Sequence, residues 1–116
     1  MSSSSIASLK KQANQRSGNR EDRASACVDL YDAYQDGDGV VKNEGEAMKW
    51  LTKAARMDDA WAQAMLAQRY RKGEGVAQSY EKAVEWYRKA ADQGDADAQF
   101  NLALCYENGK GVAQSY

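Results

Sequence analysis

The sequence of 116 residues contains no histidine, no proline and only two cysteines. Histidine is the side chain most used for acid–base chemistry near neutral pH and is a common zinc ligand. Its absence excludes most familiar catalytic and zinc-binding constellations, so we expect a protein that is not an enzyme and that holds no metal or cofactor. Cys27 and Cys105 stand far apart in the chain. Two cysteines cannot staple a small secreted scaffold as four or six do, so we expect separate, reduced thiols.

Long apolar runs are also missing. The longest, residues 102–106, is far too short for a signal-peptide core or a membrane span. The formal net charge of -1 gives no strong field to attract nucleic acid or an anionic membrane. We therefore expect a cytoplasmic protein with no nucleic-acid partner.

Residues 1–20 form a serine-rich stretch with four basic residues and no acidic one, since the first acidic residue of the chain is Glu21. Only Ile6 and Leu9 are sizeable apolar residues in this stretch, which is typical of a mobile leader. A short helix around residues 6–13 is the alternative. Attachment to nucleic acid or a membrane through the four basic residues is weakly supported, because no aromatic residues are interleaved with them.

What the chain does contain is an internal repeat. Residues 60–80 and 96–116 align at an offset of 36, with 13 of 21 positions identical. The same offset relates residues 24–55 to residues 60–91, through shared alanines, glycines and a tryptophan. A fixed period of this length is the signature of a repeat array.

Each unit predicts two helices separated by a glycine-marked turn. Ala60, Leu66 and Tyr70 share one face at helical spacing, and Gly73 suits a left-handed helix stop. Ser79 suits the start of the second helix, and Asn43 with Glu46 resembles a capping box in the first unit. The pattern predicts helices over residues 21–35, 44–57, 59–72, 79–92 and 95–108. The fold class is therefore all-α, an α-solenoid of about two and a half helix-turn-helix repeats.

These residues resemble the Sel-1-like repeats, relatives of the tetratricopeptide repeat. AWAQAMLAQRYRKGEGV followed by KAVEWYRKAADQG, within residues 60–94, matches nearly all of the family pattern. Residues 24–59 match less well, with Cys27 in place of the glutamine, and residues 96–116 match only the first half. The resemblance implies a right-handed superhelix like that of tetratricopeptide repeats. We divide the chain into a leader, 1–20, and an array, 21–116, with repeats at 24–59, 60–95 and 96–116, the last one truncated.

The resemblance also implies a non-enzymatic adaptor that holds a partner protein or peptide on its concave face, lined mainly by the first helix of each unit. The alternative is a regulatory or docking module of a longer multidomain protein or enzyme. Residues that break the repeat indicate where a partner binds. Trp61 has Ser25 and Asp97 as counterparts, so repeat packing does not require a large ring there. The predicted partner-binding residues are Trp61, Phe100, Asp32, Gln68, Arg71, Asp97 and Leu104; the alternative for each is a solvated helix surface.

Two more specific interpretations of acidic residues, as a calcium loop and as a catalytic pair, are not supported by their positions. Asp32, Asp36 and Asp38 suggest a calcium loop, but Tyr34 and Asn43 occupy positions that need ligands, and Gly37 is a repeat glycine. The acidic pairs Asp58 with Asp59 and Asp95 with Asp97 suggest acid–base catalysis. Both pairs lie at helix starts, however, where carboxylates cap free backbone amides.

The third unit stops at Tyr116, where its second helix would begin. Phe100 and Leu104 then lack a complete cover, whereas terminal repeats normally carry a polar cap. We hypothesise that this C-terminal helix self-associates or docks on a partner.

Overall fold

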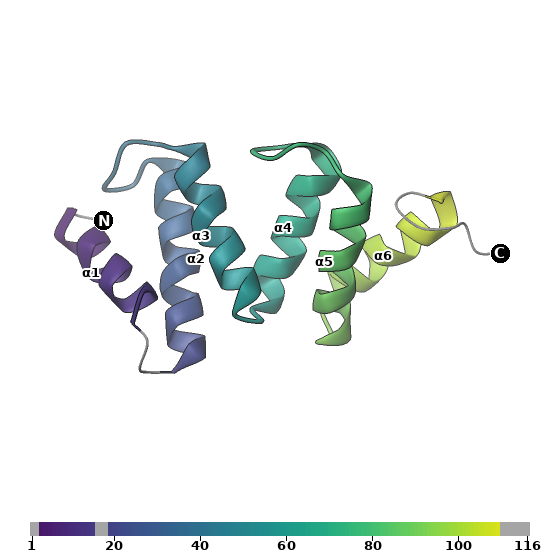
Figure 1. Ribbon diagram of the computed structural model, residues 1–116, viewed down its shortest axis with the longest axis horizontal. Coiled ribbons are helices and arrows are strands. Elements are labelled where there is room, and N and C mark those ends of the chain that lie inside the picture. Colours follow the sequence, from purple (N-terminus) through teal and green to yellow (C-terminus); the bar gives the residue numbers. More distant parts are fainter. Residues whose placement is uncertain (1–2, 16–18, 110–116) are drawn as a thin grey trace. The chain divides into compact units, whose positions relative to one another are not determined.

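The computed structural model describes residues 3–15 and 19–109, which form six helices and, within those residues, no strand (Figure 1). They divide into two compact units, residues 1–59 and residues 60–116. The five helices expected from the repeat are confirmed to within one residue at each end. No described helix is long and apolar enough to cross a membrane. The helices are α1 Ser3–Ala13, α2 Arg20–Asp36, α3 Glu44–Arg56, α4 Ala60–Lys72, α5 Tyr80–Asp92 and α6 Ala96–Asn108.

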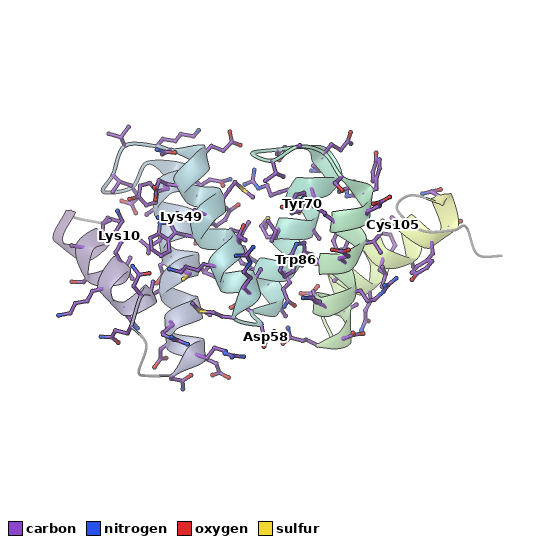
Figure 2. The ribbon with its side chains drawn as sticks, in the orientation of Figure 1. Lys10, Lys49, Asp58, Tyr70, Trp86 and Cys105 are labelled. Carbon is purple, nitrogen blue, oxygen red and sulfur yellow. The ribbon has the colours of Figure 1, made fainter. Side chains whose placement is uncertain are left out.

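Helix α1 occupies residues 3–13 of the stretch expected to be a mobile leader. It packs on α2, and Ile6 and Ala13 are buried at its inner face. Figure 2 labels Lys10 on this helix. The Lys10 ammonium lies 5.4 Å from the centre of the Tyr34 ring, and its interaction with the Tyr34 hydroxyl raises the pKa of Lys10. A few apolar residues thus give this polar segment one buried face. This agrees with the alternative expectation of a short helix around residues 6–13. Residues 1–2 and 16–18 of the leader lie outside the described residues.

Helices α2 and α3 form the core of the first unit. Leu30, Trp50 and Leu51 are fully or almost fully buried there, and so is Cys27. Asn43 caps α3 by accepting a hydrogen bond from the Glu46 backbone amide at 3.0 Å. The Glu46 carboxylate accepts a hydrogen bond from the Trp50 indole at 3.2 Å. The first half of the predicted capping box is confirmed, while the glutamate also fixes the buried tryptophan.

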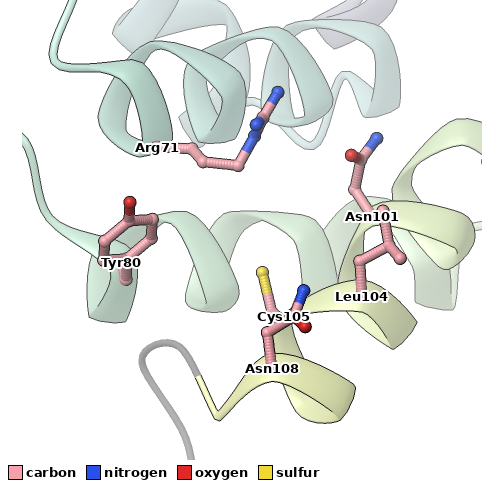
Figure 3. Close-up of a pocket in the computed structure, with 6 residues that line it drawn as sticks. All are labelled: Arg71, Tyr80, Asn101, Leu104, Cys105 and Asn108. Carbon is pink, nitrogen blue, oxygen red and sulfur yellow. The ribbon is translucent and has the colours of Figure 1, made fainter.

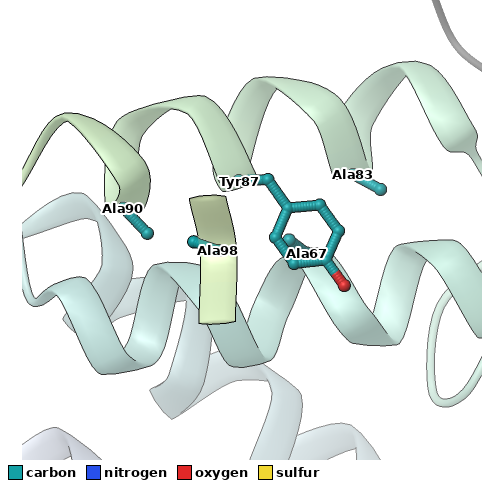
Figure 4. Packing of buried hydrophobic residues seen from close by; sticks show 5 residues of the cluster. All are labelled: Ala67, Ala83, Tyr87, Ala90 and Ala98. Carbon is teal, nitrogen blue, oxygen red and sulfur yellow. The ribbon is translucent and has the colours of Figure 1, made fainter. Parts of the chain in front are cut away.

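The second unit has a core of small residues around one aromatic ring. Alanines let α4, α5 and α6 approach closely, and the Tyr87 ring fills the space that remains (Figure 4). Trp86, the repeat counterpart of Trp50, is only partly buried at the edge of this cluster, with Lys89 4.9 Å from the centre of its ring. The cluster consists of Ala67, Ala83, Tyr87, Ala90 and Ala98.

The turns within the repeats take the predicted left-handed conformation. Gly37 and Gly73 have φ values of 72° and 71°. A Cβ atom at Gly73 would lie 3.1 Å from the Gln78 Cβ atom. The Ser79 amide returns a hydrogen bond to the Tyr70 carbonyl at 2.9 Å, which closes the loop. Glycine is therefore needed at the end of α4 for its backbone conformation and for the space around it.

Side chains cap the two helices that follow these turns and bends. Ser79 accepts a hydrogen bond from the Lys82 amide at 3.2 Å, and Asp95 accepts one from the Ala98 amide at 2.8 Å. The structural interpretation of Asp95 is confirmed. Asp58, in a left-handed conformation between α3 and α4, pairs with the Arg20 guanidinium at 2.9 Å. Both side chains are mostly exposed, so this ion pair contributes little to stability.

Candidate functional site

A small pocket opens in the second unit, with a volume of about 130 Å³. Figure 3 shows Arg71, from the last turn of α4, on one side of the space and four residues of α6 on the other. Tyr80, the first residue of α5, closes one end. The lining residues are Arg71, Tyr80, Asn101, Leu104, Cys105 and Asn108.

Helix geometry explains why α6 supplies most of the lining. Asn101, Leu104 and Asn108 recur at spacings of three and four residues, so their side chains share one face of the helix. Cys105 lies at the inner edge of that face and is buried, while Leu104 is 38% exposed. The pocket thus has a polar mouth with an apolar side wall.

Hydrogen bonds hold the α4 and α5 side of the pocket in place. Arg71 donates from Nε to the Tyr87 hydroxyl at 3.3 Å. The Gln78 side-chain amide donates to the Arg71 carbonyl at 2.8 Å and to the Tyr80 hydroxyl at 3.3 Å. Arg71 is therefore anchored by its Nε atom. The Gln78 side chain, from the loop between α4 and α5, connects the Arg71 backbone to Tyr80.

The pocket carries one positive charge. Burial raises the pKa of Tyr87, and the hydrogen bond from Arg71 only partly offsets this, so the phenol that accepts from Arg71 is neutral at physiological pH. Within the part of the chain that the structure describes, no carboxylate lies within ion-pair distance of Arg71. By contrast, Arg69 on the same helix pairs with Glu74 at 3.4 Å.

Two of the predicted partner-binding residues, Arg71 and Leu104, meet at this pocket. Phe100 is 65% exposed and lies one helical turn before Leu104 on α6, so the two share a face. Trp61, at the start of α4, is 45% exposed. Gln68 on α4 is half-buried, and Asp97 on α6 is exposed.

Asp32 is the one predicted residue outside the second unit. It is exposed on α2, at the repeat position that Gln68 and Leu104 occupy on α4 and α6. Partial burial of the carboxyl group and the nearby charges of Asp36 and Asp29 raise its pKa. Across the described residues, no three acidic or cysteine side chains come together in a way that could hold a metal ion.

The sequence analysis did not select four residues of the pocket as binding residues: Tyr80, Asn101, Cys105 and Asn108. The two asparagines break the repeat, because their counterparts in the middle unit are Met65 and Lys72. The rule that selected Trp61 could therefore have found them. Tyr80 carries no such signal, since it recurs in the repeat as Tyr116.

A shallower groove of about 370 Å³ runs along α3 in the first unit. The Lys53 ammonium donates to the Asn14 side-chain oxygen at 2.5 Å, and both Lys49 and Lys53 lie 5.1 Å from the centre of the Trp50 ring. Lys49 and Lys53 therefore already have neighbours within the unit. The lining residues are Gly45, Met48, Lys49, Thr52, Lys53 and Arg56.

Comparison with known proteins is consistent with this repeat. Residues 24–59, 62–95 and 96–116 each match the Sel1 repeat. A Sel1 repeat protein from Oxalobacter formigenes is 35% identical, with a TM-score of 0.84; the match covers 97% of this chain and 80% of that one. A protective antigen of uropathogenic Escherichia coli strains, which displays the same type of repeat fold, is 36% identical, with a TM-score of 0.81; the match covers 95% of this chain and 22% of that one. No curated protein matches. With three matched repeats and these structural neighbours, the chain belongs to the Sel1 repeat family, as its resemblance predicted.

Proposed function

We propose that this chain is a non-enzymatic adaptor that binds a partner protein or peptide through the concave face expected of its repeat array. Sel1 repeat proteins generally mediate protein–protein interactions and are generally non-enzymatic scaffolds. The observation that carries the proposal is the exposure of large apolar side chains at Trp61, Phe100 and Leu104. Exposed aromatic residues that the fold itself does not require are typical interface anchors.

Two pairs of the proposed binding residues occupy equivalent repeat positions on α4 and α6. Trp61 and Asp97 are counterparts at the starts of α4 and α6, and Gln68 and Leu104 are counterparts about two turns later. Arg71 and Phe100 complete the set in the second unit; in the first unit, Asp32 on α2 occupies the repeat position of Gln68 and Leu104. Because equivalent positions carry different side chains in different repeats, each repeat can make a different contact with a bound partner.

Affinity capture from cells that express the protein tests this surface. We expect the double variant Trp61→Ala with Phe100→Ala to lose partners that the native chain captures. Val41→Ala is the matched control, because Val41 is an 87% exposed apolar residue outside the proposed surface. Partners retained by the double variant at native levels would exclude this surface as the binding site.

The stability of the variants must be checked before a lost partner is interpreted. Phe100 is 65% exposed, so we expect Phe100→Ala to lower the free energy of unfolding by less than about 1 kcal/mol. Trp50 is almost fully buried and provides the contrast, with an expected loss of about 3–5 kcal/mol for Trp50→Ala. Urea denaturation followed by circular dichroism measures both.

Two further proposals concern the setting of this binding activity. The chain matches only 22% of the longer E. coli antigen, which supports a role for such repeats as a docking or regulatory module within a larger protein. Exposure of Phe100 and Leu104 on α6 supports self-association as another use of the same face. Sedimentation velocity tests the latter: we expect a concentration-dependent dimer that Phe100→Ala weakens, and a monomer at all concentrations would refute it.

A further inference from the structure

Arg71 is a half-buried cation whose charge is not balanced within the described part of the second unit. Its hydrogen bond to the neutral Tyr87 hydroxyl uses Nε, and the two terminal nitrogens of the guanidinium have no partner among the residues that the structure describes. A partly buried charge without a counterion is costly to the folded protein. A bound anion at this position would remove that cost.

The pocket beside Arg71 is the size of one side chain. An engineered cavity of about 150 Å³ accepts a benzene molecule, and this one measures about 130 Å³. Asn101 donates one hydrogen bond from its amide nitrogen to the Asp97 carbonyl at 2.8 Å, and that nitrogen carries a second hydrogen. Asn108 adds an exposed amide at the mouth. The lining thus offers several N–H donors around a single positive charge.

We propose that this pocket binds the side-chain carboxylate of an aspartate or glutamate on a partner peptide. Arg71 supplies the charge-assisted hydrogen bonds, and Asn101 and Asn108 supply neutral ones. The inference rests on the proposed function, because it assigns a chemistry to part of the same binding surface. It also predicts the neighbouring residue of the partner: Leu104 in the pocket wall and Phe100 one turn away favour an apolar or aromatic side chain next to the acid.

Charge matching favours a carboxylate over a phosphate group. A phosphorylated side chain carries about -1.5 to -2 charges at neutral pH and usually needs a cluster of cations. The lining residues include one arginine and no lysine, so a single negative charge is the better match. A carboxylate also fits the planar geometry of the guanidinium.

Selection from short random peptides, presented without a free C-terminus, tests the inference on the full chain. We expect the selected peptides to share an aspartate or glutamate next to an apolar residue. In fluorescence-anisotropy titrations of one such peptide, replacement of its acid by the matching amide should weaken binding at least tenfold. This change leaves the protein untouched, so an unfolded variant cannot mimic the result.

Variants of the chain then locate the carboxylate. Arg71→Gln should weaken binding of the acidic peptide at least tenfold, and should remove the preference for acid over amide. Lys72→Gln is the matched control, because Lys72 is the next residue and an exposed cation outside the pocket. Binding by the Lys72 variant should change little. Thermal melts followed by circular dichroism show whether Arg71→Gln remains folded.

The outcomes separate this inference from the broader proposal. Selected peptides without an acid, or an acid preference that survives Arg71→Gln, would overturn the carboxylate pocket; if their binding still falls on Phe100→Ala, the protein-binding surface stands. A preference for peptides that end in a free C-terminal carboxylate or carry phosphate, over internal acids, would also overturn it. Binding that is insensitive to both Arg71→Gln and Phe100→Ala would overturn both proposals.

Discussion

Arg71 on α4 donates a hydrogen bond from Nε to the hydroxyl of Tyr87 on α5, at 3.3 Å. The Tyr87 ring belongs to the core cluster of the second unit, while Arg71 lines the pocket. One contact therefore couples the packing of the helices to the position of the one arginine among the lining residues of the pocket.

Removal of the Tyr87 hydroxyl tests that coupling. We expect Tyr87→Phe to lower the free energy of unfolding by about 0.5–1.5 kcal/mol, because the ring still packs but the hydrogen bond is lost. Tyr106→Phe is the control, since the Tyr106 hydroxyl accepts a hydrogen bond from Arg88 at an exposed site. Urea denaturation measures both variants. An equal loss in the free energy of unfolding for the two variants would mean that the partly buried hydrogen bond stabilises the fold no more than the exposed one.

A buried glutamine distinguishes the middle repeat. Gln63 is 1% exposed, and its side-chain oxygen accepts a hydrogen bond from the Gln93 amide at 2.9 Å. We expect Gln63→Ala to lower the free energy of unfolding by about 1–3 kcal/mol, because it leaves a polar group without this partner and a space behind it. The repeat supplies a matched control in Gln99, which is exposed at the equivalent position of α6. Gln99→Ala should cost clearly less; a similar cost in the two variants would contradict this account.

Two glycines should respond to alanine in opposite directions. Gly73 has a φ of 71°, and a Cβ atom there would approach Gln78 to 3.1 Å, so Gly73→Ala should lower the free energy of unfolding by about 1–2 kcal/mol. Gly45 lies in the first turn of α3, where alanine is the better helix former. We expect Gly45→Ala to raise the free energy of unfolding, by up to about 1 kcal/mol. Thermal melts of the two variants check the signs, and a stabilised Gly73→Ala would show that the turn tolerates other conformations.

The raised pKa of Asp32 predicts a pH-dependent stability. Partial burial and the charges of Asp36 and Asp29 make ionisation of Asp32 less favourable in the folded chain than in the unfolded one. This penalty is absent when the pH lies well below the ordinary aspartate pKa of 3.8, and is complete above the raised pKa of the folded protein. Asp32→Asn should therefore raise the melting temperature at neutral pH.

The gain from Asp32→Asn should shrink as the pH falls through this range, because protonated aspartate and asparagine are then both neutral. Added salt should also reduce it at neutral pH, since it screens Asp29 and Asp36. Melting temperatures measured across pH test the expectation. A gain that stays constant down to acid pH would assign it to helix propensity instead of charge.

Much of the fold was predictable because it repeats. Alanine, leucine and tyrosine positions at helical spacing located five helices, and Gly73 and Asp95 marked a helix end and a helix start through local backbone and hydrogen-bond requirements. Helix α1 was harder to predict. Its sequence is polar and lies outside the repeat, and its few apolar residues form a buried face only because α2 offers a surface to pack on.

The candidate site, too, was only partly predictable from the sequence. Arg71 and Leu104 were selected from the sequence, yet nothing in the sequence showed that they line one pocket, or that Asn101 and Asn108 join them. Trp50 and Trp86 occupy the same repeat position and still differ in burial. Identical residues in neighbouring repeats meet different surroundings, and the surroundings are a tertiary property.

The sequence by itself determined the family, the helices and the turns, because a 36-residue period and glycine-marked loops act through short-range hydrogen bonds and backbone conformation. Only the tertiary structure decided which side chains are buried and which are exposed. It also decided that Arg71 is anchored to a neutral phenol, with its charge left unbalanced within the described residues. The physical reason is that burial and electrostatics depend on atoms brought together from different helices, which spacing along one helix does not specify.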